Sequence, residues 1–141
     1  MAILINIISM AIVIIILMAV IYVIHSVNRK LKEKIEIERK KLLLIHENFE
    51  KISKTNPKEK ELDTLDQIAR DMFNERDSMN LNISYVELSK LYKKEDQALK
   101  SKFCDKMSEL IYSKKTPKTE DIKEVINIFS EILNGIKIPK A

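Results

Sequence analysis

The chain opens with the run Ala2–Ile24, AILINIISMAIVIIILMAVIYVI, in which Asn6 and Ser9 are the clearly polar side chains. Fifteen of its 23 residues are Ile, Leu or Val. As a helix rising ~1.5 Å per residue, the run is about 34 Å long, which is enough to span a hydrocarbon core ~30 Å thick. Each such side chain favours insertion by about 0.3 to 0.6 kcal/mol. The sequence therefore predicts a transmembrane anchor over residues 1–28.

A cleaved signal peptide is the alternative interpretation of this run. It fits poorly, because no Lys or Arg precedes the run, the run exceeds the usual ~7 to 15 residues, and no A-x-A cleavage site follows it. Asn6 and Ser9 lie three residues apart, on one face of the predicted helix. Either they bond to another transmembrane helix, or Asn6 lies at the outer interface and Ser9 bonds to its own backbone.

The net charge of +4 is concentrated in one place. Residues 29–41 hold three acidic and seven basic residues, the latter being Arg29, Lys30, Lys32, Lys34, Arg39, Lys40 and Lys41. Residues 55–141 hold 16 basic and 16 acidic residues. A positive cluster next to a spanning segment indicates contact with anionic lipids of the inner leaflet and argues against a nucleic-acid interface. The positive-inside rule predicts a single-pass protein of the cell membrane, with its N-terminus outside and its C-terminal part in the cytoplasm.

Residues 29–54, called the stalk here, repeat apolar residues at alternating spacings of four and three. The seam of this pattern is Leu31, Ile35, Leu42, Ile45, Phe49 and Ile52, with Glu38 as its one polar position. Ile37, Leu43 and Leu44 widen the apolar stripe. Two packings fit the pattern equally: a weak parallel homodimeric coiled coil, and a single helix packed on the domain that follows.

Residues 55–135 carry four amphipathic segments, expected as helices over about 57–77, 85–93, 95–113 and 119–134. Asn56 is expected to cap the first, with Glu59 completing a capping box, and Ser84 with Glu87 forms a second box. Gly135 suits the position after the last helix. Residues 136–141 are a tail. With one glycine and one cysteine, the composition favours an all-α fold and excludes an intramolecular disulfide.

The stretch from Phe103 to Ile122, FCDKMSELIYSKKTPKTEDI, resembles the helical tail that follows transglutaminase-like domains in prokaryotic membrane proteins. In both, a helix ends in Tyr and a small basic loop precedes a Thr-Glu-Asp helix start. The resemblance covers about half of the chain. It implies a helical tail domain and no catalytic residue, because the transglutaminase domain itself is not in this sequence.

Candidates for chemistry are few in this sequence. His25 and His46 are 21 residues apart without neighbouring ligands, so no metal site and no cofactor is predicted. Cys104 has no histidine near it in sequence to activate it. The sequence thus predicts a non-enzymatic, membrane-anchored adaptor that binds an unidentified protein partner. The alternatives are an oligomeric coiled-coil scaffold and an enzyme completed by its partner.

Overall fold

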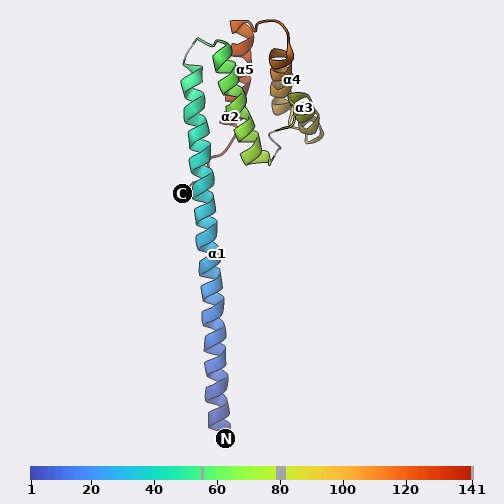
Figure 1. Ribbon diagram of the computed structural model, residues 1–141. Coiled ribbons are helices and arrows are strands. Elements are labelled where there is room, and N and C mark those ends of the chain that lie inside the picture. Colours follow the sequence, from blue (N-terminus) through green and yellow to red (C-terminus); the bar gives the residue numbers. More distant parts are fainter. Residues whose placement is uncertain (55, 79–81, 141) are drawn as a thin grey trace. The chain divides into compact units, whose positions relative to one another are not determined.

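The computed structural model describes residues 1–54, 56–78 and 82–140. This part of the chain is all-helical, as the sequence predicts (Figure 1). Its helices are α1 (Ala2–Ser53), α2 (Glu59–Asp77), α3 (Tyr85–Lys94), α4 (Ala98–Tyr112) and α5 (Thr119–Asn134).

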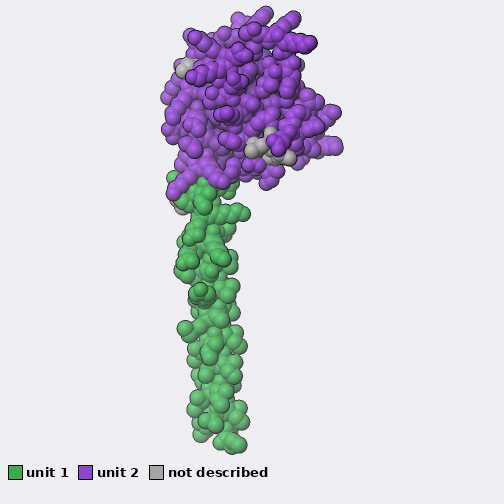
Figure 2. All heavy atoms as spheres, in the orientation of Figure 1, with its two compact units in different colours: residues 1–39, 139–141 green, residues 40–138 purple. Residues whose placement is uncertain are grey.

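The chain divides into two compact units, and α1 contributes to both (Figure 2). One unit holds residues 1–39 and the end of the chain from Pro139. The other, called the helical unit here, holds residues 40–138. Sequence analysis divides the chain between residues 54 and 55 instead. The difference arises because the last part of α1 buries apolar side chains in the same core as the other four helices.

The first half of α1 presents its apolar side chains outward. Residues 2–24 are all exposed, and the large apolar side chains among them range from 48% for Val20 to 77% for Ile3. Within the described residues, α1 is the one helix long and apolar enough to cross a membrane. It is not a core helix, since none of the apolar window is buried.

Helix boundaries depart from the predicted caps at several points. Lys58, not Asn56, is the N-cap of α2, and Glu61 rather than Glu59 accepts a 2.8 Å hydrogen bond from the Lys58 backbone N–H. Ser84 caps α3 as predicted, accepting a bond from the Glu87 N–H.

The ends of the later helices differ from prediction for a backbone reason. The fourth helix starts at Ala98 rather than near residue 95, because Asp96 adopts a left-handed conformation with φ 60°. Asp tolerates this conformation better than most residues. Ser78, with φ 54°, ends α2 in the same way. Gly135 does not do so, because its φ of −78° lies in the right-handed region.

A connected set of aromatic rings runs through the core of the helical unit. It contains all four phenylalanines of the chain, Phe49, Phe73, Phe103 and Phe129, together with Tyr85 and Tyr92. Ring centroids are 5.2 Å apart both between Phe49 and Phe129 and between Phe129 and Phe103. Each of the five helices supplies at least one ring, so the set joins the last part of α1 to every other helix.

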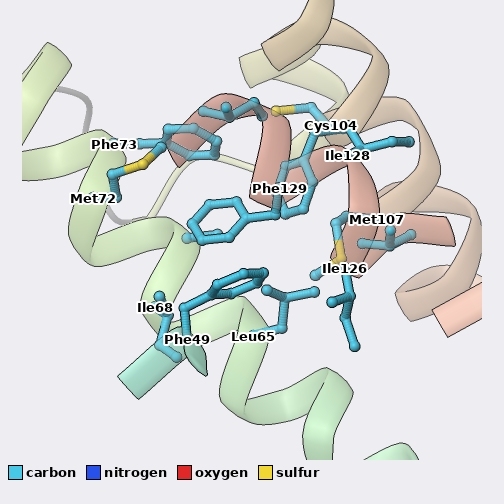
Figure 3. Close-up of a cluster of buried hydrophobic side chains, with 14 of the residues drawn as sticks. Phe49, Leu65, Ile68, Met72, Phe73, Cys104, Met107, Ile126, Ile128 and Phe129 are labelled. Carbon is cyan, nitrogen blue, oxygen red and sulfur yellow. The ribbon is translucent and has the colours of Figure 1, made fainter. Parts of the chain in front are cut away.

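Aliphatic side chains complete this core around the rings. Leu65 and Ile68 of α2 lie near Phe49 in Figure 3, and Met107 of α4 lies on the other side of Phe129. Helix α3 packs on α4, and α5 packs on both α4 and α2.

Two polar clusters fasten α3 to α2. In the first, Asp66 accepts hydrogen bonds from the Tyr85 hydroxyl and from Arg70 Nε, the latter at 2.9 Å. In the second, Asp77 Oδ2 accepts bonds from the Tyr92 hydroxyl at 2.8 Å and from Lys100 Nζ at 2.7 Å. Both tyrosines are fully buried. A buried hydroxyl needs a partner, so each aspartate removes the cost of burying a tyrosine while a cation balances its charge.

We predict that residues 40–138 fold without the anchor, whereas residues 55–138 do not. The shorter fragment lacks Leu42, Ile45, Phe49 and Ile52, which are at most 7% exposed. Burying each such side chain contributes about 1.5 to 3 kcal/mol, and four of them amount to most of a small domain's ~5 to 15 kcal/mol stability. Urea unfolding followed by circular dichroism should show a cooperative transition for the longer fragment only. An equally cooperative transition for both fragments would contradict the conclusion that the last part of α1 belongs to the helical unit.

We also predict that the helical unit loses stability steeply above about pH 10. Burial and the hydrogen bonds to Asp66 and Asp77 raise the pKa values of Tyr85 and Tyr92. The contribution is fully present below the unfolded tyrosine pKa of about 10 and is lost above it, because the unfolded chain then releases protons that the folded chain retains. Each tyrosine adds a slope of about 1.4 kcal/mol per pH unit.

Tyr85→Phe isolates this effect. At pH 8 the variant should be less stable than the parent by about 0.5 to 1.5 kcal/mol for the lost bond, and the gap should close as the pH rises to 11. Urea unfolding of the full chain in detergent, followed by near-ultraviolet circular dichroism, measures it. Tyr112→Phe, at a residue 55% exposed, is the control. A gap for Tyr85→Phe that stays constant with pH would refute the prediction.

Candidate functional site

The six predicted residues of the stalk seam fall into two groups that differ in burial. Leu42, Ile45, Phe49 and Ile52 are buried within the helical unit, while Leu31 is 54% exposed and Ile35 is half-buried. A second copy of the chain could pair along residues 42–52 only after those side chains left their own core. For this stretch the structure therefore favours the second of the two predicted packings, a helix packed on its own domain. Glu38, the polar seam position, is half-buried.

The predicted membrane-surface residues all lie on α1. Arg39 is half-buried and the other six are exposed. Successive residues turn by about 100° around a helix, so positions 29, 30, 32, 34, 39, 40 and 41 cover roughly 220° of the circumference and leave free the stripe that holds Leu31, Ile35 and Leu42. A helix that lies flat on a membrane instead gathers its basic residues on one face. The collar of charge suits a helix that passes through a headgroup layer.

Several of these basic side chains form ion pairs at the protein surface. Arg29 pairs with Glu33 at 3.9 Å, with both side chains at least 67% exposed, and Arg39 pairs with Glu36 at 3.8 Å. Exposed pairs of this kind contribute about 0 to 1 kcal/mol and are readily exchanged.

Leu43 and Leu44 form an apolar edge on the helical unit. They are 44% and 56% exposed, although they follow a buried leucine on the same helix. Their positions fall outside the four-and-three spacing, which is why the core leaves them at the surface. The sequence shows these two leucines as part of a widened apolar stripe. It does not show whether they are buried or exposed, because that depends on which face of α1 packs against the core.

A hollow of about 170 Å³ lies beside this edge, between α1 and α2. Leu44 and Ile45 line one side of it, and Asp71, Asn74 and Glu75 line the other. Lys41 closes one end by donating to Glu75 Oε1 at 2.9 Å. An exposed leucine next to a hollow with charged walls is an arrangement that receives an apolar side chain of another molecule and orients it by polar contacts.

The residues considered for chemistry are held apart. His25 and His46 both lie on α1, the first exposed and the second half-buried. Cys104 is fully buried in the core, and burial raises the pKa of its thiol to about 12. At neutral pH it is a protonated, inaccessible thiol, which is a poor nucleophile. In the part of the chain that the structure describes, no three His, Cys, Asp or Glu side chains gather as a metal site would require.

Comparison of the chain with protein-family models, with curated proteins and with solved structures finds no match. The exposed apolar edge, the charged collar and the apolar half of α1 are the features that bear on the function of this chain.

Proposed function

We propose that this chain is a single-pass, membrane-anchored adaptor whose helical unit binds another protein through the edge formed by Leu43 and Leu44. The observation that carries the proposal is the exposure of these two consecutive leucines, of which Leu44 lines the hollow between α1 and α2. Single leucines on the surface of a small domain are common, but two exposed neighbours, one of them at the rim of a hollow with polar walls, are the kind of apolar feature with a polar rim that a protein interface uses.

The anchor is supported by the unburied apolar half of α1. More than twenty consecutive side chains, nearly all apolar, project outward from residues 2–24. In water this surface would be strongly unfavourable, since each buried CH₂ group is worth about 0.8 kcal/mol. A lipid bilayer removes that cost without requiring a protein partner.

The orientation follows from the collar at residues 29–41. Its positive charge favours the cytoplasmic side, with the helical unit inside the cell and the basic side chains on anionic headgroups. Neutral charge balance in residues 55–141 leaves this segment as the one strong electrostatic attachment to the surface.

The adaptor is preferred to the coiled-coil scaffold because the core occupies most of the seam that a scaffold needs. Four of the six seam residues are buried in their own chain. The two remaining, Leu31 and Ile35, are fewer than the three heptads that a stable coiled coil requires.

A photo-crosslinking amino acid at position 44 tests the proposal in cells that make the native protein. We expect irradiation to yield a discrete adduct with one other protein, because the side chain at this position contacts the partner. The matched control is position 90, an exposed lysine on α3. Leu43→Lys combined with the probe at 44 should remove the adduct, since a charge in the apolar contact is left desolvated.

Two outcomes would overturn the proposal. An adduct with twice the mass of the chain would indicate the homo-oligomeric scaffold. Equal, diffuse labelling from positions 44 and 90 would show that the edge has no specific partner.

A further inference from the structure

A second hollow lies within the helical unit, at the other face of the last turns of α1. Its volume is about 390 Å³, within the ~300 to 1,000 Å³ of small-molecule sites. Two helical stripes form its walls. His46, Glu50 and Ser53 stand one turn apart on α1, and Lys123, Asn127 and Ser130 stand one turn apart on α5. Contact between the Phe49 and Phe129 rings holds these two helices together.

The base of this hollow is apolar. Phe49, Ile126 and Leu133 contribute to it, and Pro57 lies at the end where α1 gives way to α2. A ligand that fills the hollow therefore needs an apolar body as well as a polar group. A purely ionic species such as phosphate would leave this base without contact.

The polar part of the lining is rich in hydrogen-bond donors. Lys123 is a donor only, Asn127 and Asn134 each carry two donor hydrogens, and Ser130 carries a hydroxyl. Glu50 is the one acidic residue of the lining. Within the described residues, the Lys123 ammonium has no ion-pair partner, so the cation remains available.

His46 adds an unsatisfied group at the same wall. Its Nε2 is buried and has no hydrogen-bond partner in the part of the chain that the structure describes. A buried ring nitrogen without a partner is unfavourable. Because the His46 side chain also lines the hollow, a ligand there lies next to this imidazole.

We propose that this hollow binds a small organic acid, with the carboxylate on Lys123 and His46 and the apolar body against Phe49 and Ile126. A carboxylate accepts several hydrogen bonds, which the ammonium of Lys123, the amide of Asn127 and the hydroxyl of Ser130 can donate. Its charge is balanced by Lys123 in a charge-assisted bond. This site is independent of the edge at Leu43 and Leu44, so either one can fail without the other.

Nuclear magnetic resonance of the full chain in detergent micelles tests the site, because the chain has only two histidines. Benzoate is the first probe. The expected result is a saturable shift of the His46 ring signals with little change at His25, which lies in the other unit. Benzamide, which has the same shape without the charge, should bind at least about tenfold more weakly.

Lys123→Gln removes the cation at an exposed position, so the fold should be retained. It should weaken benzoate binding by about tenfold or more, and the matched control Lys90→Gln should leave it unchanged. N-acetylglycylphenylalanine carries the same carboxylate at the end of a peptide. Tighter binding of this probe would identify a peptide C-terminus as the source of the carboxylate, and tighter binding of benzoate would identify a free acid.

Three results would overturn the proposal. One is the absence of a saturable shift at His46 with either acid. Another is equal affinity for benzoate and benzamide, which would mean that the charge of the carboxylate does not contribute to binding. The third is unchanged benzoate affinity in Lys123→Gln.

Discussion

The contact between Phe49 and Phe129 is the interaction on which the helical unit depends. Phe49 belongs to α1 and Phe129 to α5, and the two rings lie 5.2 Å apart. Phe129 also contacts Phe103, through which the set reaches the rings of α2 and α3. Aromatic pairs at this separation contribute about 0.5 to 1.5 kcal/mol beyond the area they bury. Phe49 is one of the α1 side chains buried in this core and the one that joins the set of aromatic rings, so the contact couples the last part of α1 to the rest of the helical unit.

The two halves of α1 are thus suited to two different environments, a lipid bilayer and the core of the helical unit. Its first half is apolar on every side, as a lipid environment demands, and its last turns are apolar on the face that enters the core. The charged collar at residues 29–41 separates these two regimes. Leu43 and Leu44 depart from this pattern, because they are apolar and yet exposed at the surface of the helical unit, and the proposed adaptor function is based on this exposure.

Much of the fold could be predicted from local sequence. The 3.6-residue period fixed the face of each helix, and Ser84 and Asp77 marked the ends of helices correctly. The starts of α2 and α4 were missed because the backbone conformation at Lys58 and Asp96 decides them, and the actual N-caps, Lys58 and Gln97, are not residue types that usually cap a helix. The resemblance of residues 103–122 to a transglutaminase tail stays a prediction, as does the absence of catalysis.

The candidate sites were harder to predict, since both depend on long-range contacts. The heptad spacing of residues 31–52 suits a partner helix and a self-packed helix equally, and Phe129 decides between them from far along the chain. The tyrosine clusters were not predicted either, because Asp66 and Tyr85 are 19 residues apart and join only when α3 folds back on α2. His46 and Lys123 are brought to one hollow by the same contact that buries Phe49.

A double-mutant cycle on Phe49→Leu and Phe129→Leu measures that contact directly. Leucine retains an apolar side chain, so each variant should stay folded, and urea unfolding of the full chain in detergent gives the free energies. The two substitutions should be non-additive by about 0.5 to 1.5 kcal/mol, because each removes the same ring contact. The control pair Phe49→Leu and Tyr112→Leu should be additive, since Tyr112 is exposed and is not among the rings that Phe49 contacts. Additivity of Phe49→Leu and Phe129→Leu would contradict the role of this contact in joining α1 to the core.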